Sequence, residues 1–300
     1  MPLLLAGLEA HGELANGQAR FTDTVRRELL SMSAATIDRY LTPVRQKTLL
    51  RGVSTTTPSP LLRSSITVRK AGDEIDQVPG FLAVDPLAHC GPTRKGEFVR
   101  TVNLTDMHTG WVHTVSIRNN VHVHIRFAVD HALDAIPFEV TGMDFDNGSE
   151  FINHDMVTWA AERDIYFTRS RPYKKNDQTT IESKNNHLVC KYAYYWRYDT
   201  AGALTLLNQL WPLVTLRMNY LTPTKKPIGW VTDQAGKRRR VFDTPRTPLD
   251  RLLASDTLTN NQRDTLLATR EKLNPAHLTR EIDRIQQKLT AIAKTATLDL

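Results

Sequence analysis

Five short stretches in the middle of the chain have the pattern of buried or half-buried strands, with alternating apolar and polar side chains or a short apolar run. They cover residues 81–89, 98–104, 111–117, 138–146 and 165–168. Apolar side chains at helical spacing predict helices between or after the later strands. These helices cover residues 121–136, the stretch that follows Ser149, a segment that opens near Gln178, and residues 199–220. Ser149 can cap the second of them. The pattern predicts an α/β core with a mixed five-stranded sheet flanked by helices.

Three carboxylates fall on or beside these predicted elements. Asp85 lies at the centre of the first apolar run, and Asp146 ends a strand just before an Asn-Gly turn. Glu182 falls in the first turns of the helix that opens near Gln178; its separation from Asp146, 182 − 146 = 36, leaves thirty-five residues between them. A strand, helix, strand and helix in succession return the chain beside its starting point, so the pattern brings these carboxylates together. Asp144 shares a strand face with Asp146, and spacing alone leaves it as a rival.

A trio of carboxylates is suited to phosphoryl transfer. Attack on a phosphodiester needs charge stabilised on the entering and leaving oxygens, which two divalent cations about 3.5–4 Å apart can supply. Mg²⁺ prefers oxygen ligands and retains water, so three carboxylates suffice when DNA oxygens complete its shells. The predicted site therefore needs no histidine or thiolate ligand.

Several ordered motifs span about residues 25–255, and together they resemble one family. They read PGF..D..AHCG, GEF.RT..LTD..TGW, DNGSEFIN and SRPY.KND. With the predicted order of strands and helices, they resemble the catalytic core of DDE transposases and retroviral integrases, which have a ribonuclease H-like fold. The closest likeness is to bacterial insertion-sequence transposases of the integrase-like type.

The resemblance implies a DDE polynucleotidyl transferase that cleaves DNA and transfers strands at insertion-sequence ends. Asp85 would bridge two Mg²⁺ ions, Asp146 would hold one and Glu182 the other, with Mn²⁺ able to replace Mg²⁺. The metal would activate water for hydrolysis, or the freed 3′-hydroxyl for strand transfer. The implied partners are double-stranded DNA, as element ends and target, and further copies of the chain assembled on that DNA.

Residues 1–50 are predicted to form an N-terminal helical unit. Two short helices around a tight turn suggest a helix-turn-helix, in which Arg39, Arg45 and Lys47 lie off the apolar stripe and can approach phosphates. Pro43 removes a backbone donor from the second helix, which predicts a bend or an early end. A plain helical hairpin packed on the core fits the pattern equally well, and the family resemblance favours DNA binding.

A basic loop over residues 169–178 leads directly to Glu182. Lys174 and Lys175 can bind phosphates, and Tyr173 can stack on or wedge a base, which would make the loop a DNA clamp. A solvated basic loop without a ligand is the open alternative.

The chain departs from the family pattern just after Glu182. Many insertion-sequence relatives carry a Lys or Arg seven residues after the glutamate, whereas this chain has Val189 there. Lys184 and Lys191 flank that position, and either is a candidate for contacting the element end.

Composition divides the rest of the chain. Residues 51–79 begin with a stretch rich in Ser, Thr and Pro and are predicted as a linker, before a catalytic core over residues 80–222. Residues 223–300 should contain a hairpin over 231–242, with a basic run at 237–240, and then a helical tail. The hairpin fits either nonspecific DNA contact or a plain surface role.

The helical tail has apolar residues at alternating spacings of four and three. They are Leu278, Ile282, Ile285, Leu289 and Ile292. This seam predicts either a local hairpin with the preceding apolar stripe, or a contribution to a dimer or higher multimer.

Charge and composition limit the remaining choices. The net charge is +7, and residues 20–70 hold ten Lys or Arg against three acids, which indicates a polyanionic partner. Two cysteines exclude a disulfide framework and a four-cysteine zinc site. We expect no targeting segment, no membrane span and no nucleotide cofactor, since residues 91–96 lack the order of a phosphate-binding nucleotide loop. These features predict a cytoplasmic, nucleoid-associated protein.

Three smaller interpretations complete the sequence reading. His89 and Cys90 should pack in the core, because the chain lacks a second Cys/His pair at short spacing for zinc. Asp106 should form a turn between strands. The alternatives to a transposase are a transposase-derived DNA-binding protein without recombination activity, and a ribonuclease H-like nuclease.

Overall fold

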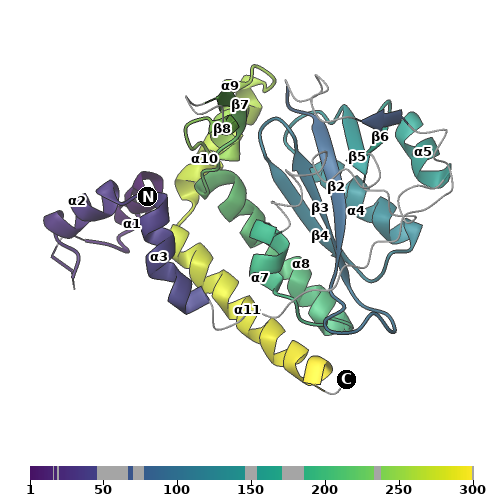
Figure 1. The fold of residues 1–300 in the computed structure, drawn as a ribbon, viewed down its shortest axis with the longest axis horizontal. Coiled ribbons are helices and arrows are strands. Elements are labelled where there is room, and N and C mark those ends of the chain that lie inside the picture. The colour runs from purple at the N-terminus through teal and green to yellow at the C-terminus, as the bar shows by residue number, and fades with distance from the viewer. Residues whose placement is uncertain are drawn as a thin grey trace.

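The computed structural model describes residues 1–15, 17–18, 20–45, 67–69, 78–145, 154–170, 186–232 and 238–298. These residues form N-terminal helices, a central sheet with its covering helices, and a C-terminal hairpin followed by helices (Figure 1).

The central sheet is mixed and has the strand order β1-β6-β5-β2-β3-β4. The strands are β1 (Thr67–Arg69), β2 (Phe81–Ala88), β3 (Arg100–Asp106), β4 (Val112–Ile117), β5 (Gly142–Phe145) and β6 (Tyr166–Ser170). β2, β3 and β4 pair antiparallel, whereas β5 is parallel to both β2 and β6. This order confirms the ribonuclease H-like core of five strands. β1 adds a sixth strand, parallel to β6, from within the stretch predicted as a linker.

Helices cover both faces of this sheet. Those in or next to the core are α4 (His122–Ala135), α5 (His154–Ala161), η4 (Asn186–Cys190), α7 (Lys191–Ala193), α8 (Ala201–Leu216) and η5 (Arg217–Leu221). α4 and α5 pack on one face, where the Trp159 indole of α5 donates to Asp130 of α4 at 2.9 Å. α8 packs on β4 from the opposite face, where the Trp211 indole donates to the Ser116 hydroxyl at 2.7 Å. The sheet is thus enclosed from two sides (Figure 1).

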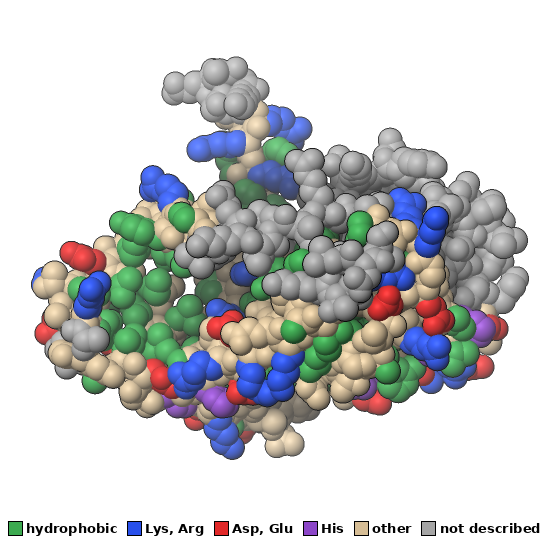
Figure 2. Space-filling view, turned by 90° about the horizontal axis from the view of Figure 1, so that it is seen from below, with side chains coloured by type: hydrophobic (Ala, Val, Ile, Leu, Met, Phe, Trp, Pro, Cys, Tyr) green, Lys and Arg blue, Asp and Glu red, His purple; other side chains and the backbone are tan. Residues whose placement is uncertain are grey.

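The N-terminal helices are α1 (Pro2–Ala10), α2 (Asp23–Ser31) and α3 (Ala34–Arg45). Ser33 caps α3, since its hydroxyl accepts from the Thr36 amide at 3.1 Å. α3 continues past Pro43 and ends at Arg45. Leu30 and Leu41 remain 38% and 41% exposed, and apolar side chains gather at the left in Figure 2, where these helices lie. α2 and α3 thus leave apolar side chains exposed, whereas Leu5 of α1 is buried.

The C-terminal part consists of β7 (Pro227–Thr232), β8 (Arg238–Phe242), α9 (Pro248–Ala254), α10 (Asn260–Lys272) and α11 (Pro275–Leu298). The predicted hairpin is confirmed and begins four residues earlier than expected, at Pro227. The apolar seam of α11 is buried within the chain, with Ile282 and Leu289 each 1% exposed and α8 as its main contact. The prediction that the seam packs on the preceding stripe is therefore wrong, and α8 occupies the surface proposed for a second chain.

No helix among the described residues combines the length and the apolar character needed to cross a membrane.

Candidate active site

Asp85 lies in the middle of β2, at the centre of the sheet. It pairs across the antiparallel ladder with Asn103 of β3, which is fully buried. Asp85 itself is half-buried, whereas the residues on both sides of it in β2 are buried. Pairing with β3 at Asp85 and with β5 up to Val84 fixes the backbone here, while the carboxylate keeps partial access to solvent.

Asp85 belongs to a sheet face that carries many polar side chains. Side chains alternate between the two faces of a strand, and paired residues share a face. The register therefore groups Asp85 with polar residues of β3, β4, β5 and β6. They are Thr101, Asn103, Thr105, Thr114, Ser116, Asp144 and Thr168. We call this set the polar face, and the opposite side, covered by α4 and α5, the apolar face.

A continuous hydrogen-bond chain crosses the polar face. His89 Nε2 lies 2.7 Å from Thr101 Oγ1, which lies 2.7 Å from Ser116 Oγ. Ser116 Oγ then accepts from the Trp211 indole at 2.7 Å. Asn103 joins the same face through its Oδ1, which accepts from Thr114 at 3.2 Å. These bonds satisfy polar groups that α8 seals from water.

His89 is the most deeply buried titratable group on this face, with 1% of its surface exposed. Burial lowers the pKa of His89 to about 3, so the ring is neutral at physiological pH. Its Nδ1 has no hydrogen-bond partner. Cys90 is 2% exposed, so the prediction that both residues serve core packing is confirmed.

The end of β5 lies beside Asp85. Phe145, the last residue of β5, pairs with Val84, and the sequence continues into Asp146, which lies outside the described residues. The rival Asp144 pairs with Ala83, two positions before Asp85. Asp144 is 3% exposed and its Oδ1 accepts from the Thr168 hydroxyl at 2.8 Å. This bond ties Asp144 to β6.

The segment after Glu182 also approaches Asp85. Burial raises the pKa of the Cys190 thiol, and the negative charge of Asp85 raises it further, which requires the two groups to be close. Glu182 and Lys184 lie outside the described residues, and η4 begins at Asn186. The structure thus brings the segment downstream of Glu182 to the strand that carries Asp85.

The position seven residues after Glu182 is part of the core. Val189 is fully buried, so it does not offer a surface contact. Lys191 is exposed, at the start of α7, with its Nζ 5.6 Å from the centre of the Tyr192 ring.

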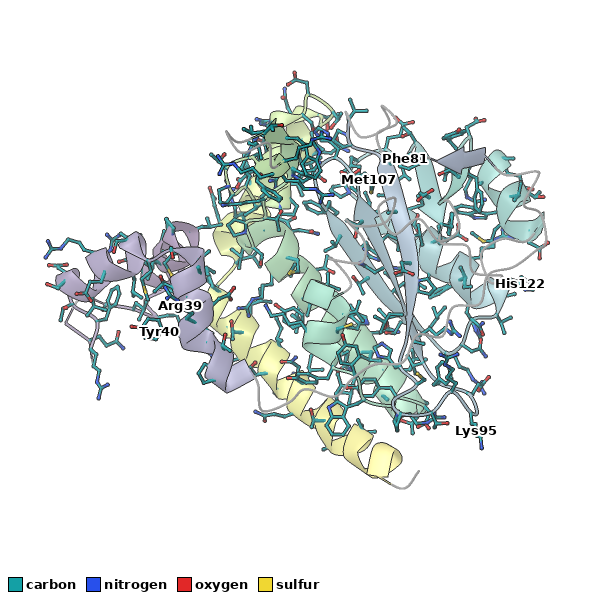
Figure 3. The ribbon with its side chains drawn as sticks, viewed as in Figure 1. Arg39, Tyr40, Phe81, Lys95, Met107 and His122 are labelled. Carbon is teal, nitrogen blue, oxygen red and sulfur yellow. The ribbon has the colours of Figure 1, made fainter. Side chains whose placement is uncertain are left out.

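The other predicted DNA-contacting residues are described only in part. Arg39 is exposed on α3, and its guanidinium donates to the Thr36 hydroxyl at 3.3 Å (Figure 3). Arg45 ends α3. Four further residues lie outside the described part of the chain: Lys47, Tyr173, Lys174 and Lys175.

Asp85 is the one predicted metal ligand within the described ranges. Over those ranges, no cluster of three or more His, Cys, Asp or Glu side chains is placed to hold a metal. The half-exposed carboxylate of Asp85 fits one ligand of a hard divalent cation, and the neutral buried His89 offers no competing charge.

Asp106 forms the turn that the sequence predicts, at the end of β3. Its carboxylate accepts from the Gly80 amide at 2.8 Å and from the Thr109 amide and hydroxyl at 2.6 Å each. Burial raises the pKa of Asp106, and these bonds partly counter that effect.

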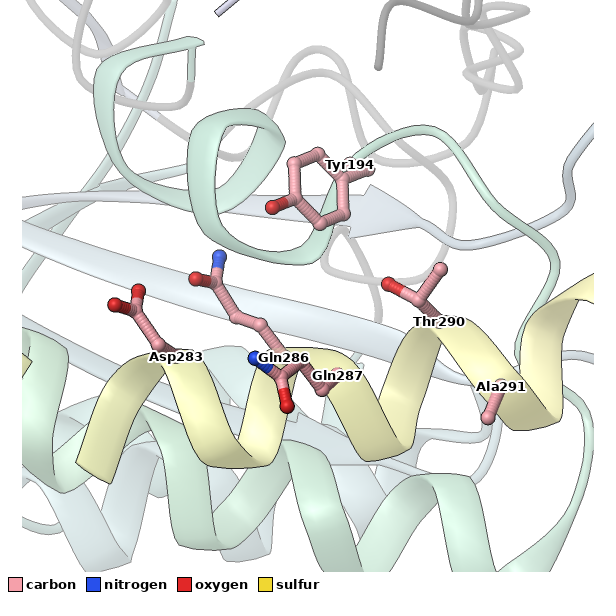
Figure 4. Close-up of a pocket in the computed structure, with 6 residues that line it drawn as sticks. All are labelled: Tyr194, Asp283, Gln286, Gln287, Thr290 and Ala291. Atoms are coloured by element: carbon pink, nitrogen blue, oxygen red, sulfur yellow. The ribbon is translucent and has the colours of Figure 1, made fainter. Parts of the chain in front are cut away.

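A separate cavity of about 410 Å³ lies between Tyr194 and α11 (Figure 4). Its other lining residues are Asp283, Gln286, Gln287, Thr290 and Ala291. Of the predicted catalytic residues, only Asp85 is described, and it does not line this cavity.

Sequence reasoning overlooked two features of the site. The polar face was visible as alternate polar residues in the runs RTVNLTD and VHTVSI, which contain Thr101, Asn103, Thr105, Thr114 and Ser116. The second feature is Arg197, whose guanidinium donates to backbone carbonyls of the turn after β2. It carries no comparable signal, because a single arginine forms no repeating pattern.

No protein-family model matches the chain. An uncharacterized protein of Sinorhizobium fredii, y4rM, is 38% identical over 228 residues, covering 75% of this chain and 63% of that protein. The chain therefore spans less than two thirds of that relative.

Two solved structures are similar to part of the chain. The catalytic core domain of BIV integrase has a TM-score of 0.39 and 15% identity, covering 58% of this chain and 93% of that one. The HTLV-2 integrase catalytic core domain in complex with magnesium has a TM-score of 0.37 and 15% identity, covering 50% and 92%.

Proposed function

We propose that the chain is a DNA polynucleotidyl transferase, a transposase of the integrase type that cleaves and joins DNA at the ends of an insertion sequence. The observation that carries the proposal is the position of Asp85. It lies half-buried on the central strand, level with the end of β5, and near enough to Cys190 to shift that thiol's pKa. The sequence places DNG directly after β5 and Glu182 four residues before η4.

The proposed catalytic and metal-binding residues are Asp85, Asp146 and Glu182. When bound, two Mg²⁺ ions would supply Lewis-acid stabilisation of the attacking and leaving oxygens, and Mn²⁺ would substitute for them. The chain's own contribution is to fix the position of Asp85, through a strand that is paired on both sides and backed by the buried Asn103.

DNA would be held by basic residues outside this carboxylate group. Arg39, Arg45 and Lys47 of the N-terminal unit are proposed to bind element ends through their phosphates. Residues on the segments flanking Glu182 would bind the strand near the reacting phosphodiester: Tyr173, Lys174, Lys175, Lys184 and Lys191. Joining two ends to one target requires two active sites, so we expect a homo-oligomer on DNA.

A joining assay tests the proposal. Purified protein is incubated with Mg²⁺ or Mn²⁺ and a DNA fragment carrying the sequences that flank its coding region. Asp85→Asn, Asp146→Asn and Glu182→Gln should each reduce strand transfer at least ~100-fold, because each removes a charge that positions the reacting centre. Asp134→Asn makes the same chemical change on an exposed position of α4 and should retain activity. Full activity of Asp85→Asn would refute the proposal.

Metal binding supplies a readout that does not depend on activity. Mn²⁺ should raise the thermal midpoint of the wild-type protein, since a ligand that binds only the folded state stabilises it. The shift should be smaller in Asp85→Asn and unchanged in Asp134→Asn. DNA binding without cleavage in any metal would favour a DNA-binding derivative, and cleavage of an RNA–DNA hybrid without joining would favour a nuclease.

A further inference from the structure

The turn between β2 and β3, residues 91–97, wraps around one buried side chain. Arg197 has 5% of its surface exposed and extends into the turn. Its guanidinium donates to four backbone carbonyls, those of Cys90, Thr93, Lys95 and Glu97, at 3.0–3.3 Å. Its Nε also donates to Asp199 at 2.7 Å, which balances its charge. One cation therefore fixes the backbone of the whole turn.

Two glycines permit this wrapping. Gly91 has a φ of 60°, and a Cβ added there would lie 2.9 Å from Arg197 Cβ. Gly96 has a φ of 76°, and its added Cβ would lie 3.3 Å from Arg197 Nη2. Left-handed backbone is strained for residues with a side chain, and here the space is also filled. The turn is thus built to hold one shape around Arg197.

The outward side of this turn is positively charged. Arg94 and Lys95 are exposed, and neither is in an ion pair with a described residue; Lys95 lies at the outer edge of the molecule (Figure 3). The acid of the turn, Glu97, is engaged elsewhere by Arg118 at 3.1 Å and Asn119 at 2.7 Å. These hydrogen bonds and the charge of Arg118 lower the pKa of Glu97. Arg94 and Lys95 therefore have no neutralising partner among the described residues, and they stand on a fixed backbone.

We propose that Arg94 and Lys95 form a phosphate-binding site for the sugar-phosphate backbone of the DNA on which Asp85 acts. The inference rests on the proposed function. The five residue steps from Asp85 to Cys90 span about 17 Å at roughly 3.3 Å per residue, or about five base pairs at 3.4 Å each. A duplex whose phosphodiester lies at Asp85 can therefore extend over the turn. The site reads no bases, because both contacts are to phosphate.

The test is the salt dependence of duplex DNA binding, followed by fluorescence anisotropy with the full chain. Each phosphate contact contributes about 0.9 to the slope of log K against log salt. Arg94→Ala with Lys95→Ala should reduce the magnitude of the slope by up to about 1.8 for every sequence tested. The control, Lys272→Ala with Lys288→Ala, removes the same charge from exposed positions of α10 and α11 and should leave the slope unchanged.

A second variant separates charge from shape. Gly96→Ala keeps both cations but disturbs the turn around Arg197, so it should weaken binding several-fold; thermal unfolding checks that the variant folds. Unchanged affinity in Gly96→Ala would overturn the role of the fixed turn, and an unchanged slope in the double variant would overturn the site. If the wild-type protein binds no DNA, both the phosphate-binding site and the proposed function fail. If the wild-type protein binds DNA and the double variant has an unchanged slope, only the phosphate-binding site fails.

Discussion

The two faces of the central sheet are buried by different chemistry. On the apolar face, side chains such as Val84, Leu104 and Phe145 pack beneath α4 and α5. On the polar face, α8 covers threonines, a serine and an asparagine that are connected by hydrogen bonds. Apolar packing is non-directional, whereas each hydrogen bond requires a particular distance and angle. The polar face thus fixes the relative positions of β2, β3 and β4 more narrowly than apolar contact does.

This difference bears on catalysis. Asp85 lies on the polar face, and its cross-strand neighbour Asn103 belongs to the hydrogen-bonded set. A reacting group must be held close to its productive geometry, and small displacements are costly. The face that fixes geometry is therefore the one that carries the proposed catalytic carboxylate.

The largest stability effect should come from the apolar face. Leu104→Ala removes a fully buried side chain and leaves a cavity, which should lower the free energy of unfolding by about 2–5 kcal/mol in chemical denaturation. Val123→Ala on α4 is the control, because Val123 is 59% exposed and should change stability by less than about 0.5 kcal/mol. Equal losses in the two variants would show that the apolar face is not the main source of stability.

A smaller loss should follow from breaking the polar chain at its centre. Ser116→Ala leaves the Trp211 indole without its acceptor and should cost about 1–3 kcal/mol in the free energy of unfolding. Adding Trp211→Phe removes the orphaned donor, so the double variant should lose less than the sum of the two single losses. Strict additivity would mean that the bond contributes nothing to the face.

The pH dependence of stability should reveal the buried imidazole of His89. Its pKa is about 3 in the folded protein, against an ordinary value of 6.5, so below pH 6.5 the unfolded chain takes up a proton that the folded chain does not. Stability should fall as the pH decreases from 6.5 toward 3, by up to about 1.4 kcal/mol per pH unit.

Denaturation of His89→Gln at pH 7, 6, 5 and 4 should show a shallower fall than the wild-type protein. His113→Gln is the comparison, since burial and the neighbouring His131 lower the pKa of His113 to about 4 and its contribution ends there. An identical pH profile for His89→Gln and the wild-type protein would contradict the burial of a neutral imidazole.

The sequence predicts the strands of the core well because each has a local period. Alternation identified β2, β3 and β4, and the acidic turn at Asp106 followed from the preference of Asp for such turns. The run at residues 138–146 was predicted too long, because Phe138 is buried like a strand residue although β5 begins only at Gly142. A pattern of apolar residues indicates which side chains are buried, but it does not indicate whether their backbone pairs with another strand.

The rest depends on contacts that have no local signal. The seam of α11 shows that one side of the helix is buried, but the stripe on α8 and the stripe before α11 are equally apolar partners. The contact of Arg197 with the turn joins residues about one hundred positions apart, and nothing in either segment specifies the other. For the candidate site, the sequence predicts Asp85 and its strand, whereas the approach of Cys190 to Asp85 emerges only from the fold.

The packing of α11 also has a consequence for the order in which the site is completed during synthesis. α11 lies along α8, and Gln286 donates to the Tyr192 carbonyl of α7 at 2.7 Å, so the segment that approaches Asp85 is held by a helix made much later. Roughly 100 residues separate these elements, which at 5–20 residues per second is about 5–20 s of translation. During that interval the nascent chain contains the strands of the core without the helix that contacts α7.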